Sequence, residues 1–324
     1  MNLPTASKRL LKCVGAEKGH HVIVVADHDN LIGLARSVEK AAKQMGATTR
    51  LFDARNAPRE KALKQILAHG KEKTSKLPEG VNVVNLSSTV GFRFPVTEGL
   101  SKMGAYVAHV PTTRLDAVLA LLSIDPGALE KTGNRLMEKL SKAEKFRIKS
   151  GENRVLEMKW NNRKRSFVKD VGIIRQTPAR WGNIGGEVFT APITTQGKIT
   201  FHHIPRFGIM GTPVTVEIRG NKAVIAKSLP EELKDFLRKS PEASQVGEFG
   251  IGLMKHKVLG DTLHDEKASG TIHLAFGDSL PEDGTGGEIQ SEHHLDLISE
   301  NPTVEMFDGK KWATVIRKGK LLVK

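Results

Sequence analysis

The stretch His21-Val22-Ile23-Val24-Val25-Ala26, followed directly by Asp27-His28-Asp29-Asn30, decides the fold of the N-terminal half. The first run is short and rich in β-branched residues, which favours a buried strand, and the polar residues after it favour a turn. Beyond the turn, apolar residues recur at steps of three and four as far as Met45, and Gly46 follows. This spacing predicts an amphipathic helix that stops at a glycine. A buried strand followed by such a helix is typical of an α/β domain.

The same alternation continues along the next hundred residues. It predicts strands at 48–52, 81–86 and 106–110, and helices at 59–69, 96–103 and 129–145. Alternating strands and helices imply a parallel sheet with helices on both faces. We therefore predict a doubly wound α/β domain over residues 1–145.

The turn after the first strand offers little for a ligand. It lacks the G-x-G-x-x-G spacing that lets backbone approach a pyrophosphate, so nucleotide binding is not supported. Asp27, His28 and Asp29 are interpreted as turn and helix-cap residues rather than metal ligands.

From residue 146 onwards the pattern changes to short strands. They are predicted at 146–149, 155–159, 198–203, 213–219 and 222–226, with one helix at 230–239. The pair Gly220-Asn221 favours a hairpin between the last two strands. We predict a β-rich α+β domain over residues 146–324.

Composition places the chain among folded, globular proteins. Of its 324 residues, 39% are hydrophobic and 27% are charged. The sequence contains no apolar run long enough for a membrane span and no signal-peptide pattern at its start, so we expect a cytoplasmic protein without membrane contact. Cys13 is the single cysteine, which excludes internal disulfides and thiolate clusters. Any metal must be bound by His, Asp or Glu.

The basic charge is unevenly distributed. The formal net charge is +14, and residues 1–150 carry 25 Lys and Arg against 14 Asp and Glu, so most of the excess lies in the N-terminal half. Such an excess raises nucleic acid as a partner. Lys61, Lys64, Lys71 and Lys73 are, however, spread over a helix without interleaved aromatic residues. We interpret them as a solvated surface, and leave a polyanion contact as the alternative.

Five ionisable residues of the C-terminal half stand in glycine-rich or apolar surroundings. They are Glu187, Glu248, His273, His294 and Asp296. A buried carboxylate costs several kcal/mol unless it is paired or bound to a metal. A cation would therefore explain all five positions together, although each alone is more typical of a paired strand residue or a core histidine.

The spacing of His294-Leu295-Asp296 supports this interpretation. In a strand, residues two apart project to the same face, so His294 and Asp296 form half of a site while Leu295 faces the opposite way. Three carboxylates and two imidazoles suit two divalent ions about 3.5–4 Å apart, with one carboxylate bridging them and a shared water as nucleophile.

Four motifs carry a resemblance to a known family. They are Gly186-Glu187-Val188-Phe189-Thr190-Ala191-Pro192, Gly247-Glu248-Phe249-Gly250-Ile251-Gly252, the stretch from Asp265-Glu266-Lys267 through Gly270-Thr271-Ile272-His273-Leu274-Ala275-Phe276-Gly277, and His294-Leu295-Asp296. In this order they resemble the thermophilic aminopeptidase T family of metallopeptidases. The motifs cover about residues 146–324, and the likeness extends more loosely over the N-terminal domain.

The resemblance implies a function and a set of roles. It implies metal-ligand roles for Glu187, Glu248, His273, His294 and Asp296, with Glu248 as the bridge, and zinc, cobalt or magnesium as the metal. It also implies release of N-terminal amino acids from peptides, and a homodimer. We accordingly expect a metallo-aminopeptidase in which Glu187 and Glu248 also serve catalysis, acting on a peptide or small amide.

One position departs from the family. Its peptidases place a catalytic tyrosine seven residues after the histidine of the third motif, where this chain has Leu280. A lost oxyanion donor costs about 2.7–4 kcal/mol of transition-state stabilisation. Lys255, His256, His264 and His293 are candidate replacements, although each is expected at the surface.

Two other functions remain open. His273, His294 and Asp296 alone form the two-histidine, one-carboxylate set of non-haem iron oxygenases, and the chain is more distantly similar to 2,5-dihydroxypyridine dioxygenases, which use one iron. Retention of both Glu187 and Glu248 argues against a single iron. The third possibility is a non-catalytic, metal-containing protein that binds polyanions through its basic half.

Overall fold

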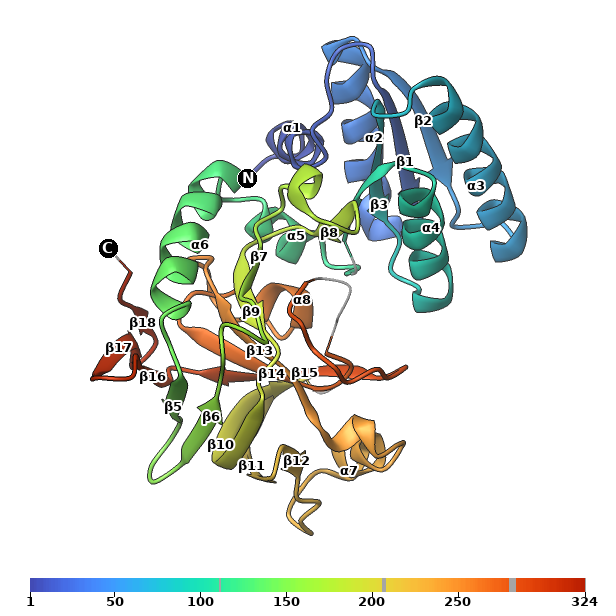
Figure 1. The fold of residues 1–324 in the computed structure, drawn as a ribbon. Coiled ribbons are helices and arrows are strands. Elements are labelled where there is room, and N and C mark those ends of the chain that lie inside the picture. The colour runs from blue at the N-terminus through green and yellow to red at the C-terminus, as the bar shows by residue number, and fades with distance from the viewer. Residues whose placement is uncertain (111, 206–207, 280–283, 324) are drawn as a thin grey trace. The chain divides into compact units, whose positions relative to one another are not determined.

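The computed structural model describes residues 1–110, 112–205, 208–279 and 284–323. The chain forms two compact units (Figure 1), one made of residues 1–128 and 170–185 and the other of residues 129–169 and 186–324. In the described part of the chain, no helix has the length and apolar character needed to cross a membrane.

The first unit is built on a parallel sheet with strand order β2-β1-β3-β4-β8. Its strands are β1 (His21–Ala26), β2 (Thr48–Asp53), β3 (Val81–Leu86), β4 (Tyr106–His109) and β8 (Trp181–Asn183). Its helices are α1 (Leu3–Cys13), α2 (Asp29–Met45), α3 (Arg59–Lys76), α4 (Val90–Lys102) and α5 (Leu115–Leu121), with the 3-10 turn η1 (Ile174–Gln176). This architecture confirms the predicted α/β class.

The sheet of this unit is covered on both faces. Figure 1 shows α1 and α2 on one face and α3 and α4 on the other. Every residue of β1 and of β3 is buried, as expected for strands between two helix layers. On the α3 and α4 face, Ile66 and Leu100 pack against strand residues such as Val83 in one hydrophobic core.

The polar turn after β1 has a structural role. His28 is the N-cap of α2, and its Nδ1 accepts a hydrogen bond from the backbone N–H of Asn30. The Asp27 carboxylate accepts hydrogen bonds from the N–H groups of Ser88 and Thr89. Gly46 ends α2 with φ of 87°, a left-handed conformation that glycine adopts without strain. The cap interpretation of this turn is confirmed.

The second unit is dominated by a curled antiparallel sheet. Its main path runs β18-β17-β16-β5-β6-β10-β15-β14-β13-β9-β7, and β11 and β12 extend it from β10. The strands are β5 (Lys145–Lys149), β6 (Val155–Lys159), β7 (Val168–Asp170), β9 (Glu187–Thr190), β10 (Thr194–Ile204), β11 (Gly208–Arg219), β12 (Lys222–Ala223), β13 (Val246–Gly252), β14 (Thr271–Gly277), β15 (His294–Glu300), β16 (Thr303–Phe307), β17 (Trp312–Arg317) and β18 (Lys320–Leu321). The helices are α6 (Pro126–Leu140), α7 (Glu231–Leu237) and α8 (Thr262–Asp265), with the 3-10 turn η2 (Glu242–Ser244).

The division between the units differs from the single boundary expected after residue 145. Residues 129–145, which include most of α6, group with the second unit, and residues 170–185 group with the first. Residues 170–185 belong to the first unit because they contain β8, which pairs in parallel with β4 and extends the α/β sheet.

Candidate metal centre

Four neighbouring antiparallel strands carry the five predicted ligands. Glu187 starts β9, Glu248 lies in β13, His273 in β14, and His294 and Asp296 at the start of β15. These strands are adjacent in the sheet, in the order β15-β14-β13-β9. The sheet therefore gathers residues that are up to 109 positions apart in the sequence.

The strand register explains why two of the carboxylates meet. Ala275 of β14 is paired with Glu248 on one side and with Asp296 on the other. Directly paired residues project to the same face of a sheet, and the small Ala275 side chain leaves the space between the two carboxylates open. The alternation along β15 also puts His294 on the face of Asp296, as the sequence predicts.

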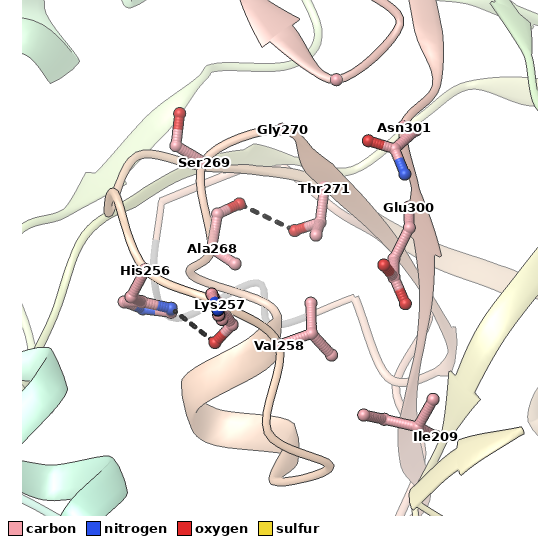
Figure 2. A pocket seen from close by; sticks show the side chains of 11 residues that line it. Ile209, His256, Lys257, Val258, Ala268, Ser269, Gly270, Thr271, Glu300 and Asn301 are labelled. Carbon is pink, nitrogen blue, oxygen red and sulfur yellow. Dashed lines mark hydrogen bonds between the residues drawn. The ribbon is translucent and has the colours of Figure 1, made fainter.

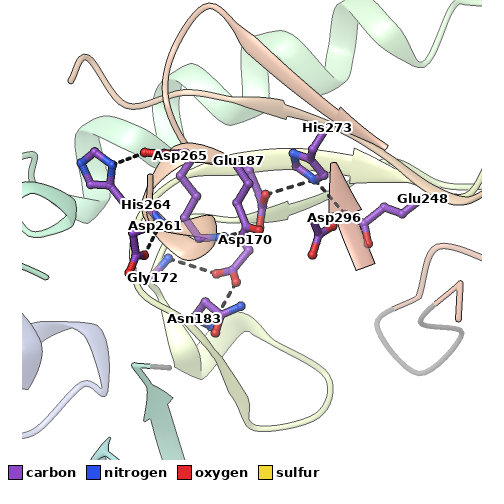
Figure 3. A network of polar contacts seen from close by, with 12 residues as sticks. Asp170, Gly172, Asn183, Glu187, Glu248, Asp261, His264, Asp265, His273 and Asp296 are labelled. Atoms are coloured by element: carbon purple, nitrogen blue, oxygen red, sulfur yellow. Dashed lines mark hydrogen bonds and ion pairs between the residues drawn. The ribbon is translucent and has the colours of Figure 1, made fainter. Parts of the chain in front are cut away.

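All five side chains form one cluster. Nε2 of His273 lies 3.0 Å from Oε1 of Glu248 and 3.5 Å from Oε2 of Glu187. Nε2 of His294 lies 3.3 Å from Oδ1 of Asp296 and 3.7 Å from Oε2 of Glu248. Figure 3 shows Glu187 and Glu248 on either side of His273, with Asp296 beside them. Their ligand roles remain predictions.

Three of the residues already lie within reach of a single ion. Glu248, His273 and Asp296 each offer one ligand atom, and these atoms are within 4.8 Å of one another. Glu187 and His294 border this group, and the His294 side chain, at 26% exposure, is the most open of the five.

Gly250 makes room for the imidazole of His273. The two residues are paired across β13 and β14, and the ring lies over the glycine. A Cβ atom at position 250 would stand 2.0 Å from both Cε1 and Nε2 of His273, closer than atoms can approach. The glycine-rich character of the second motif is therefore needed for the orientation of a predicted ligand.

Two further residues of this centre, Lys267 and Glu266, were not predicted from the sequence. Lys267 has no exposed surface, and its ammonium donates to Oε1 of Glu187 and, at 2.9 Å, to Oε1 of Glu266. Glu266 and Lys267 lie in the run Asp265-Glu266-Lys267, and such consecutive charged residues are typical of a solvated surface. Their burial beside the five predicted ligands could not be inferred from the residue types alone.

A second polar network supports the segment that carries Lys267. The buried Asp265 carboxylate contacts Nδ1 of His203 and Nδ1 of His264, each at 2.8 Å, and accepts backbone hydrogen bonds from Leu259 and Gly260. Burial alone would raise the pKa of Asp265, but the hydrogen bonds from the two histidines hold it well below its usual range. His264, expected at the surface, is fully buried because it is anchored to this carboxylate.

The electrostatics of the centre favour cations. Burial would lower the pKa of His273, but its hydrogen bond to Glu248 and the nearby Glu187 raise the pKa to about 9. His294 behaves alike: burial opposes its charge, and Asp296 and Glu248 raise its pKa to about 10. The carboxylates thus stabilise positive charge on both imidazoles.

The donor set fits a divalent metal ion. Among the described residues, Oε2 of Glu187 is buried and accepts no hydrogen bond, which is unfavourable unless a cation compensates it. Carboxylate oxygens and imidazole nitrogens together are ligands for zinc, cobalt, manganese or iron. A metal would replace the protons that the histidines otherwise hold.

The sequence matches no protein-family model. No curated protein matches it either. Several solved structures share its fold, including the following two. One is a 2,5-dihydroxypyridine dioxygenase from Pseudomonas putida KT2440, with a TM-score of 0.71 and 17% identity over 99% of this chain and 97% of that one. The other is wild-type AmpT from Thermus thermophilus, with a TM-score of 0.67 and 18% identity over 98% of this chain and 99% of that one. At these identities the likeness establishes the common fold.

The position of the family tyrosine, Leu280, lies outside the described residues. Of the candidate replacements, His264 is engaged with Asp265, and His256 stacks on His264 with 3.6 Å between ring centroids. Neither forms a contact with the five clustered residues among the interactions of the described chain.

Proposed function

We propose that this protein is a metal-dependent hydrolase, an aminopeptidase that uses two divalent ions to release the N-terminal residue of a peptide or small amide. The observation that carries the proposal is the position of Glu248. One of its oxygens faces His273 at 3.0 Å and the other faces His294 at 3.7 Å. A carboxylate that offers one oxygen to each of two histidines is placed as a bridge between two ions.

The remaining residues divide around this bridge. Glu187 accompanies His273, and Asp296 accompanies His294, so each histidine has its own carboxylate partner. These five residues would hold the ions. When bound, divalent ions would polarise the scissile carbonyl and lower the pKa of a nucleophilic water.

The chain itself supplies orientation and proton transfer. Lys267 binds one oxygen of Glu187 and leaves the other toward His273, which fixes the orientation of that carboxylate. Glu187 and Glu248 are the carboxylates placed to accept the proton of an attacking water and to pass it to the leaving amine. The homodimer implied by the family resemblance belongs to the same proposal.

A second function is favoured by a specific observation. The dioxygenase structure shares the fold over nearly the whole chain, and His273, His294 and Asp296 lie in one cluster here. Such a set holds one ferrous ion in ring-cleaving oxygenases. The competing observation is the presence of Glu187 and Glu248 in the same cluster, which one iron does not require.

Parallel assays of amide hydrolysis and of oxygen consumption distinguish the two proposed functions. We expect metal-loaded protein to hydrolyse aminoacyl p-nitroanilides, to lose this activity on chelation, and to regain it with zinc, cobalt or magnesium. Glu248→Ala should remain inactive after reloading, whereas Glu305→Gln, on the distant strand β16, should stay active. Consumption of oxygen with 2,5-dihydroxypyridine in the presence of ferrous iron, without amide hydrolysis, would instead establish the dioxygenase.

A further inference from the structure

A second polar pocket lies in the C-terminal unit, apart from the predicted metal ligands. It has a volume of about 430 Å³ and is formed by residues 256–258, residues 268–271, the end of β15, Ile209 and Gly319. None of the five clustered ligands lines it. Its size is that of a site for a small molecule.

Two side chains of opposite charge line this pocket without an ionic partner. Within the described residues, neither Lys257 nor Glu300 forms an ion pair or a side-chain hydrogen bond. Figure 2 shows Glu300 next to Asn301 on one side and Lys257 next to His256 on the other. Lys257 is exposed and Glu300 is half-buried, so both charges can reach a ligand that enters the pocket.

Neutral polar groups complete the walls. In the part of the chain that the structure describes, the Ser269 hydroxyl and the Asn301 carboxamide form no side-chain hydrogen bond, and Nε2 of His256 is buried without a partner. Burial lowers the pKa of His256 to about 4, so its imidazole adds no charge. Asn301 is exposed and Ser269 is half-buried, whereas the buried Nε2 of His256 is unfavourable unless a ligand or water satisfies it.

The backbone around the pocket is closely packed. Gly270 has φ of 97°, and a Cβ atom there would stand 2.2 Å from the carbonyl oxygen of Gly319. Only glycine permits this approach between the segment before β14 and the turn before β18. The position of the pocket wall at this point therefore depends on the glycine at position 270. Ile209 and Val258 add apolar surface.

We propose that this pocket binds a free α-amino acid, with its ammonium at Glu300, its carboxylate toward Lys257, and an apolar side chain against Ile209 and Val258. A zwitterion satisfies both unpaired charges at once, which neither a simple amine nor a simple acid does. The assignment is independent of the reaction at the metal centre, because the two sites share no side chain.

Calorimetric titration with L-leucine tests the assignment. It is done on metal-loaded protein and on chelated protein, so that binding at the metal centre is recognised by its loss on chelation. We expect one leucine per chain with equal affinity in both states. In chelated protein, which cannot hydrolyse an amide, leucinamide lacks the carboxylate and N-acetyl-leucine lacks the ammonium. Each should bind at least about tenfold more weakly than leucine, because each loses a charge-assisted hydrogen bond.

Variants place the ligand in the pocket. Glu300→Gln and Lys257→Met should each weaken leucine binding at least about tenfold. Lys227→Met, which changes an exposed lysine outside the pocket, should leave binding unchanged. Thermal unfolding without ligand checks that the variants remain folded.

The proposal would be overturned by no binding at millimolar leucine, by binding that disappears on chelation, or by binding that neither Glu300→Gln nor Lys257→Met weakens. Equal affinity for N-acetyl-leucine would also refute it, since the ammonium would then have no partner. Amide hydrolysis at the metal centre is measured separately, so failure of either proposal leaves the other interpretable.

Discussion

Lys267 is a lysine without exposed surface inside an acidic centre. Its ammonium contacts the carboxylates of Glu187 and Glu266, and its charge also lowers the pKa of Asp296, although His294 has the larger lowering effect. Buried charges are tolerated only when they are compensated, and removal of one partner leaves the others exposed to a low dielectric. Lys267 therefore acts as an internal counter-ion that keeps these carboxylates in place.

Replacement of this lysine should reveal that role. Lys267→Met is expected to lower the free energy of unfolding by about 3–5 kcal/mol in chelated protein, because Glu187 loses its cation. Urea denaturation measures the effect, and added zinc should restore part of the loss. Lys255→Met, at an exposed lysine, should change stability by less than about 0.5 kcal/mol. Equal effects of the two substitutions would show that Lys267 is not a counter-ion.

A substitution at Gly250 tests whether metal binding requires the observed orientation of His273. In Gly250→Ala, the added methyl group would stand 2.0 Å from Nε2 of His273, so the ring must move away from Glu248. We expect metal affinity to fall by about 10–100-fold, the range found when the orientation of a ligand is disturbed. Gly211→Ala, where a Cβ meets no atom within 4 Å, is the matched control. Unchanged metal affinity in Gly250→Ala would mean that His273 does not bind metal in the observed orientation.

At the scale of elements, a buried histidine at the end of a strand in the α/β sheet gives stability a pH dependence. His109 ends β4, is 2% exposed, and lies 3.0 Å from the Thr97 hydroxyl through its Nδ1. Burial, with a smaller effect of Arg93, lowers its pKa to about 3. An unfolded histidine titrates near about 6.5, so between these values only the unfolded chain binds the proton.

Acid should therefore weaken the α/β unit. The stability contributed by neutral His109 is complete above about pH 6.5 and decreases as the pH falls toward the folded pKa, with a slope of up to about 1.4 kcal/mol per pH unit. Urea denaturation between about pH 7 and pH 5 should show a shallower decline for His109→Gln than for the native chain. Parallel declines would mean that His109 does not contribute to this dependence.

Many regular elements follow from local pattern, although strands such as β16, β17 and β18 were not predicted. Strands β3 and β6 have the bounds that the sequence predicts, and α2 ends at the predicted glycine. α4 begins at Val90 rather than at 96, because the helix includes Pro95 instead of starting after it. α1 was not predicted, although its buried residues follow a helical spacing. The short strand β8 could not be predicted, since it depends on pairing with β4 from a segment 72 residues further along the chain.

Site residues could be predicted where an ionisable residue stands in unusual sequence surroundings, and could not where its surroundings are ordinary. Glu187, Glu248 and His273 stand in apolar or glycine-rich surroundings, which marked them as candidates before any geometry was known. Lys267 stands in charged surroundings and was not marked, because its burial depends on Glu187, 80 residues away. His264 was considered only as a surface residue, and its burial follows from the polar network around Asp265. A local window contains no information about such pairing.

At the scale of the whole molecule, fold and chemistry are separate questions. A dioxygenase and AmpT share this fold at similar likeness, so the architecture does not choose between hydrolysis and oxygenation. The choice depends on how many ions the five clustered residues hold. The basic excess of the N-terminal half lies outside that cluster and does not bear on it.

The most direct test of the central claim is the amount of divalent metal bound per chain, measured by elemental analysis after chelation and reloading with zinc, cobalt or ferrous iron. The native chain and Glu187→Ala are compared, with Glu305→Gln as a control on β16. We predict two ions in the native chain and in the control, and one or none in Glu187→Ala. A single iron that is indifferent to loss of Glu187 would contradict the hydrolase, and no bound metal would contradict the metal centre itself.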